Sequence, residues 1–139
     1  MNSQLTGDSH TDTVRAMAEK TLAKISYDEA LDLLNRAVDE KGPWYIYPQY
    51  PDRTVGCVYA VRGEDRELIP SCIVGHVVNY INPSLLEELH AREGRGAYLV
   101  LPTILDLDVR TTELLATAQR LQDKGAPWGE SVSIASRKV

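Results

Sequence analysis

Two cysteines and two histidines of the sequence are candidate zinc ligands. Cys72 and His76 lie four residues apart in the segment PSCIVGHVVNYIN, residues 70–82. On a helix this spacing places both side chains on one face, a turn apart. Together with Cys57 and His90 they would make a Cys2His2 set, which binds zinc. The spacing of the four matches no standard zinc module, because structural zinc ligands usually come in closer pairs.

The same helix suggests a second chemistry, nucleophilic catalysis. Cys72 lies near the N-terminus of the predicted helix, where the dipole lowers the pKa of a thiol. His76 would act as the base, and Asn79 would orient its ring. Against this, side chains on successive turns of one helix stack in a column rather than surround a substrate. Catalytic Cys and His residues normally come from separate parts of a chain.

A third interpretation assigns these residues to packing. At about 100° per residue, the helix over residues 71–81 has one broad β-branched face and one narrow stripe. The stripe consists of Cys72, Gly75, His76 and Asn79. Small residues there would let a neighbouring strand or helix approach closely, and the polar ones would bond buried backbone groups. We favour packing, which predicts no cofactor; zinc belongs to the alternative.

The segment WYIYPQYP, residues 44–51, is the strongest candidate for a binding surface. It places four aromatic side chains and two prolines within eight residues, and aromatic residues are enriched in protein interfaces. The alternative is that these rings cover one side of the sheet. The candidate partner-binding residues are Trp44, Tyr45, Tyr47 and Tyr50.

Periodicity and turn signals predict an α+β fold. Alternating apolar residues predict a strand over residues 54–62, which turns and returns over 66–69 as an antiparallel hairpin. Capping boxes at Ser26/Glu29 and Ser84/Glu87 and an N-cap at Asp108 mark three helix starts. We therefore expect the hairpin, about residues 54–69, to pack against four to five short helices, with the helix over 71–81 at the centre. Residues 97–101 could form a further strand, and the last four residues are expected to fray.

Length and charge limit the class of protein. The chain has 139 residues and a net charge of −5, which disfavours a nucleic acid as partner. We expect a disordered tail over residues 1–12 and a single globular domain over 13–139. The polar N-terminus lacks the apolar core of an export signal, so a cytoplasmic location and no membrane association are expected. A homodimer could form through an edge strand or a face with Leu114, Leu115 and Leu121.

Several short motifs together resemble a known group of proteins. The motifs are Cys57-Val58-Tyr59, Pro70 to His76, Ala118-Gln119, Gln122-Asp123, Gly125 and Trp128-Gly129. Their order and spacing resemble short uncharacterised proteins of actinobacteria and their bacteriophages. The resemblance covers residues 30–135 and implies no catalytic residue. It implies a small accessory protein, encoded by a bacteriophage, that acts inside a host cell by binding a host or phage protein.

The leading functional hypothesis is thus a binding protein rather than an enzyme. It rests on the lack of a convergent catalytic motif and on the resemblance. The alternative is a metal- or thiol-dependent enzyme that uses Cys57, Cys72, His76 and His90.

Overall fold

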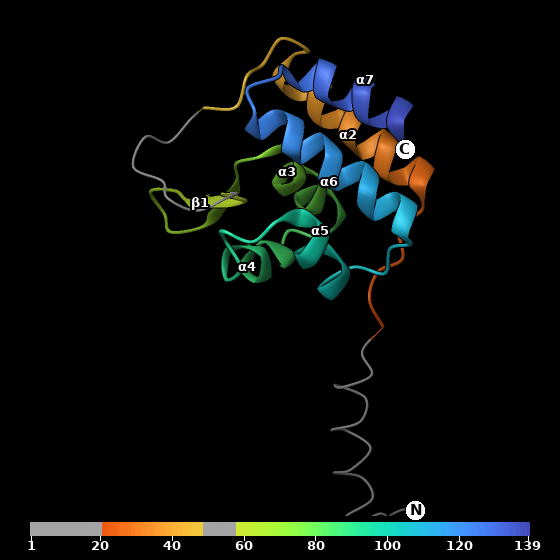
Figure 1. Cartoon of the computed structure of the whole chain (residues 1–139). Helices are drawn as coiled ribbons and strands as arrows, with labels where there is room; N and C mark the ends of the chain where they lie inside the picture. Colours follow the sequence, from red (N-terminus) through yellow and green to blue (C-terminus); the bar gives the residue numbers. More distant parts are fainter. Residues whose placement is uncertain (1–20, 49–57) are drawn as a thin grey trace, which may run out of the picture.

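The computed structural model describes residues 21–48 and 58–139 of the chain. Within these ranges it contains helices, one 3-10 turn and a two-stranded antiparallel sheet, which confirms the predicted α+β fold (Figure 1). In chain order the elements are α2 (Tyr27–Lys41), β1 (Ala60–Arg62), β2 (Leu68–Pro70), α3 (Ile73–Ile81), α4 (Leu85–His90), α5 (Ala97–Val100), η1 (Leu101–Thr103), α6 (Val109–Asp123) and α7 (Trp128–Lys138). The predicted tail over residues 1–12 lies outside the described residues.

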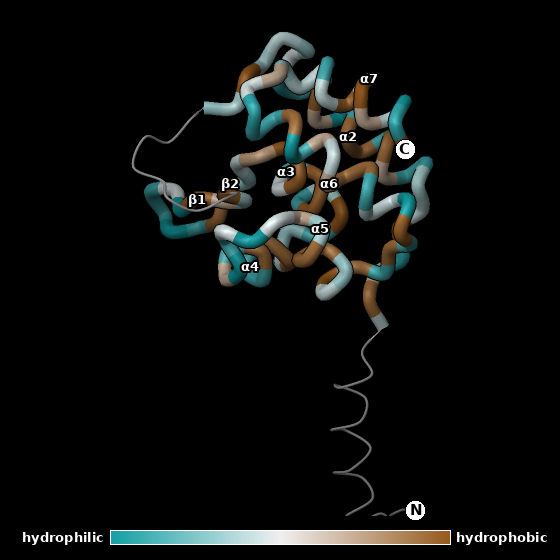
Figure 2. The backbone as a smooth tube through the Cα atoms, in the orientation of Figure 1, coloured by the Kyte–Doolittle hydropathy of each residue, from teal (hydrophilic) through white to brown (hydrophobic). Residues whose placement is uncertain are grey.

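Three long helices form one side of the molecule, and α3 lies beneath them. Helices α2, α6 and α7 all contact one another, and α3 packs against both α2 and α6 (Figure 1). On its other side α3 contacts α4 and β2. Every residue from Ile73 to Val78 is buried, so α3 is the central helix, as predicted. Figure 2 shows hydrophobic residues gathered where these helices meet and hydrophilic residues in the hairpin turn.

Local capping explains where α2 and α6 begin. The Ser26 hydroxyl accepts a hydrogen bond from the Glu29 N–H, and the Glu29 carboxylate accepts one from the Ser26 N–H, which confirms the first capping box. Asp108 accepts from the N–H of Thr111 at 2.7 Å and caps α6, also as predicted. Gly42 follows α2 with a φ of 98°, a conformation that glycine adopts without steric cost.

The hairpin is shorter than the predicted one in the described part of the chain. β1 and β2 pair with Val61 opposite Ile69, and the turn between them places Arg66 at a φ of 67°. The predicted strand began at residue 54, but residues 54–57 lie outside the described ranges, and β1 begins at Ala60.

Other local predictions were wrong. Residues 97–101 are helical in α5 and η1 rather than a strand. The Ser84/Glu87 capping box does not form, because the Asn82 side chain accepts bonds from both the N–H and the hydroxyl of Ser84. Helix α7 continues to Lys138, whereas the last four residues were predicted to fray.

Two of the three leucines of the proposed dimer face on α6 are part of the core. Leu114 and Leu115 have 0% exposure and pack inside the chain, so they are not available to a second copy. Among the helices of residues 21–48 and 58–139, none combines the length and the apolar character needed to cross a bilayer.

Gly75 brings α3 and the hairpin into direct backbone contact. A Cβ atom at this position would lie 2.1 Å from the carbonyl oxygen of Tyr59, far inside van der Waals distance. The same oxygen accepts a hydrogen bond from the N–H of Ser71 at 2.8 Å, so it has little room to move away. This confirms the expectation that Gly75 allows close approach of a neighbouring segment.

We predict that Gly75→Ala lowers the free energy of unfolding by about 3 kcal/mol, because the extra methyl group must displace backbone rather than a flexible side chain. Urea unfolding followed by circular dichroism would measure it. Gly96→Ser is the matched control, since a Cβ at Gly96 meets nothing within 4 Å. Equal stability of Gly75→Ala and the parent protein would show that the two segments separate easily.

Candidate functional site

The first turn of α3 begins inside the protein core. Cys72 is the N-cap, with extended backbone at φ −84° and ψ 173°, and its Sγ accepts a hydrogen bond from the Gly75 N–H at 3.3 Å. Its side chain has 0% exposure. The thiol group therefore caps the helix from a buried position, in agreement with the packing interpretation.

Two glutamines of α6 complete this cap. The Oε1 atom of Gln122 accepts from the Ile73 N–H at 2.8 Å, and Oε1 of Gln119 accepts from the Val74 N–H at 3.2 Å. Both glutamines are almost fully buried. The first three N–H groups of α3 are thus bonded by side chains, which the sequence analysis did not anticipate. The i, i+3 spacing of two glutamines on an otherwise apolar helix face was the available signal.

His76 is directed at the backbone of its own helix. Its Nδ1 lies 2.9 Å from the carbonyl oxygen of Cys72, so in the neutral ring Nδ1–H donates to that oxygen. The ring packs edge-on against Trp128, with centroids 5.1 Å apart. Burial lowers the pKa of His76, and the Lys41 charge acts in the same direction, while the Cys72 carbonyl and Glu40 oppose it. The imidazole is held as a buried, neutral structural group.

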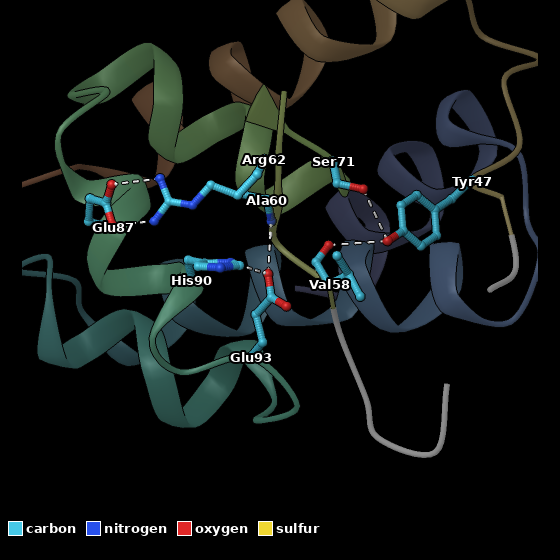
Figure 3. Close-up of polar contacts among 8 residues, drawn as sticks. All are labelled: Tyr47, Val58, Ala60, Arg62, Ser71, Glu87, His90 and Glu93. Carbon is cyan, nitrogen blue, oxygen red and sulfur yellow. Dashed lines mark hydrogen bonds and ion pairs between the residues drawn. The ribbon is translucent and has the colours of Figure 1, made fainter. Parts of the chain in front are cut away.

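His90 has different surroundings. Its Nδ1 lies 2.9 Å from Oε2 of Glu93, and the same oxygen accepts from the N–H of Ala60 at 3.4 Å (Figure 3). Glu93 therefore links the end of α4 to the start of β1. An exposed Arg62–Glu87 ion pair at 3.1 Å lies beside it (Figure 3), and such pairs contribute little to stability.

The structure describes three of the four candidate zinc ligands, Cys72, His76 and His90. Cys57 lies outside the described residues, while His76 contacts Trp128 and His90 contacts Glu93. Within the described part of the chain, no cluster of three or more His, Cys, Asp or Glu side chains is arranged to hold a metal ion.

The aromatic segment alternates between inward and outward side chains. Trp44 and Ile46 are 84% and 54% exposed. Tyr45 turns inward and packs edge-on against Trp128 with centroids 4.8 Å apart. Tyr47 is 4% exposed; its hydroxyl donates to the Val58 carbonyl at 3.1 Å (Figure 3). The predicted binding residues thus divide into one exposed ring and two rings that anchor the segment.

Tyr50, the fourth predicted binding residue, lies outside the described residues. The anchor at Tyr47 is reinforced by Ser71, whose hydroxyl donates to the Tyr47 oxygen at 3.3 Å (Figure 3). Through these two bonds Tyr47 connects the end of the aromatic segment to residues on both sides of the hairpin.

The first turn of α7 holds the other end of the aromatic segment. The N–H of Trp128 donates to the Tyr45 carbonyl at 2.8 Å, and the N–H of Gly129 donates to the Pro43 carbonyl at 2.9 Å. A Cβ at Gly129 would lie 2.9 Å from that same Pro43 oxygen, so glycine permits the contact. Beside it is an open hollow of about 350 Å³, lined by Pro43, Trp44, Pro127, Gly129 and Glu130. This hollow and the Trp44 ring form the candidate site, which we call the Trp44 surface.

No protein-family model, curated protein or solved structure matches the chain.

We predict that Gln122→Leu lowers the free energy of unfolding by about 1–3 kcal/mol, because it leaves the buried Ile73 N–H without an acceptor. Urea unfolding would report the loss, and hydrogen exchange would show faster exchange at the Ile73 amide. Arg120→Ala, an exposed change on the same helix, is the control and should shift stability by less than about 0.5 kcal/mol. An unchanged Ile73 exchange rate in Gln122→Leu would contradict the assigned bond.

We predict that stability falls as the pH drops from 7 to 5. The pKa of His76 is lowered in the folded state, so the unfolded chain binds a proton first, below its pKa of about 6.5. The slope can reach about 1.4 kcal/mol per pH unit. Glu29 and Asp108 also have lowered pKa values, but their ordinary values of 4.5 and 3.8 place their effect below this window.

Urea unfolding at each pH would measure this slope. His76→Asn should flatten it, because the titrating ring is gone. A slope that survives in His76→Asn would assign the pH dependence to another group.

Proposed function

We propose that this protein acts by binding another protein through the Trp44 surface rather than by catalysis. The observation that carries the proposal is the 84% exposure of Trp44 in a segment whose neighbours Tyr45 and Tyr47 are anchored. Leaving a tryptophan in water forgoes the burial that stabilises most large aromatic side chains. A tryptophan on an anchored backbone is typical of the residues that dominate binding energy in interfaces, because tryptophan is enriched among such residues.

The surroundings of Trp44 extend the apolar surface. Pro43, Ile46 and Pro48 are exposed along the same segment. Prolines limit backbone freedom, so this surface loses little conformational entropy when a partner binds. Tyr98 and Leu99 on α5 are also exposed, at 51% and 71%.

The resemblance to proteins of actinobacteria and their bacteriophages supplies the proposed context. We propose that the partner is a host or phage protein met inside an actinobacterial cell. The buried position of Cys72 and the backbone contact of His76 support binding over thiol chemistry, because neither group is presented to a substrate.

We predict that Trp44→Ala weakens the complex at least roughly tenfold, because truncating a central aromatic residue typically costs about 2 kcal/mol or more of binding energy. The partner would be captured from an actinobacterial extract by the full chain, identified by mass spectrometry, purified and titrated by calorimetry. Val109→Ala, at a 65% exposed position on α6, is the matched control and should bind like the parent protein. A purified partner that binds Trp44→Ala as tightly as the parent chain would refute the proposal.

A further inference from the structure

The chemistry of the hollow beside Trp44 indicates what kind of group it accepts. Its volume of about 350 Å³ is at the lower end of the range for ligand pockets, which suits one side chain rather than a folded element. Its lining residues include three apolar ones, Trp44, Pro43 and Pro127, and one acidic residue, Glu130. Glu130 is exposed, and so keeps its charge available.

The α7 N-terminus next to this hollow is not arranged to bind an anion. The N–H groups of Trp128 and Gly129, which would receive an anion, already donate to the carbonyls of Tyr45 and Pro43. A helix N-terminus corresponds to about half a positive charge, which the full negative charge of Glu130 in the first turn outweighs. Glu130 therefore offsets the positive charge of the helix N-terminus beside the hollow.

The face of a tryptophan ring attracts cations more strongly than that of any other side chain. The neighbouring ring of this segment already shows the interaction, since Nζ of Lys41 lies 5.3 Å from the centroid of Tyr45. Arg36 and Arg110 likewise lie over Tyr80 and Tyr27, whereas no lysine or arginine of residues 21–48 and 58–139 lies over Trp44. The strongest cation acceptor thus faces solvent.

We infer that the Trp44 surface binds a lysine or arginine side chain of the partner, held between the Trp44 ring and the Glu130 carboxylate. This rests on the proposed function and names the chemistry of the partner, a protein with an exposed basic segment. The net charge of −5 favours the encounter with such a segment. Arginine fits best, because its planar group stacks on the ring and donates to a carboxylate at the same time.

The probe is the peptide acetyl-Gly-Gly-Arg-Gly-Gly-amide, titrated into ¹⁵N-labelled full chain. The chain has two tryptophans, and Trp128 is fully buried, so its indole signal serves as an internal reference. The matched peptide carries citrulline, which has nearly the shape of arginine without the charge. We expect the Trp44 indole signal to shift saturably with the arginine peptide and roughly three- to tenfold more weakly with citrulline.

Two variants assign the effect to its residues. Glu130→Gln should weaken the arginine peptide several-fold and reduce its salt dependence, and Glu113→Gln, an exposed carboxylate of α6, should not. Equal shifts with both peptides would show an apolar surface without charge selection, and no shift with either would show no cation site. Either result overturns the inference.

The purified partner separates this inference from the proposed function. Loss of the partner in Trp44→Ala with full binding in Glu130→Gln would overturn the cation site and leave the binding function in place. Full binding in Trp44→Ala would overturn the function instead. Concentration-dependent self-association that Trp44→Ala abolishes would show that a second copy of the chain, rather than a basic partner, covers this surface.

Discussion

The rest of the structure depends on how the N-terminus of α3 is bonded inside the core. A helix that begins away from water has N–H groups that its own backbone leaves unbonded, and each such group costs about 1–3 kcal/mol. Here Gln122, Gln119 and the Cys72 thiol accept from Ile73, Val74 and Gly75 in turn. Because two acceptors lie on α6, the cap also determines how α6 is aligned against α3.

Close backbone approach at Gly75 then places the hairpin against the same end of α3. Tyr59 reaches the glycine through its carbonyl oxygen, and only the absence of a side chain allows this. Tyr59, the start of α3 and two glutamines of α6 meet here. The polar side chains of this region form hydrogen bonds with buried backbone groups. This explains why residues such as Cys72 and His76 need not form a reactive site.

The functional surface lies where α7 holds the aromatic segment. The first turn of α7 donates its N–H groups to the carbonyls of Pro43 and Tyr45, and Pro43 and Trp44 lie in a turn that the Tyr45 N–H closes on the Gly42 carbonyl. Tyr45 and Tyr47 enter the protein, and Trp44 is left outside beside Glu130. The same bonds therefore close the core and present the ring on which binding is proposed to depend.

The sequence by itself determined the local structure: the caps at Ser26 and Asp108, the α+β class and the central position of α3 follow from short-range patterns. Residues 97–101 were ambiguous, because a short apolar run fits a strand or a helix until its neighbours decide. Only the tertiary structure decided which aromatic residue is exposed and what His76 and the two glutamines bond. The two glutamines bond backbone groups 45 and 49 residues away in the sequence. The segment that carries Trp44 is held by the first turn of α7. No local spacing of residues encodes such distant contacts.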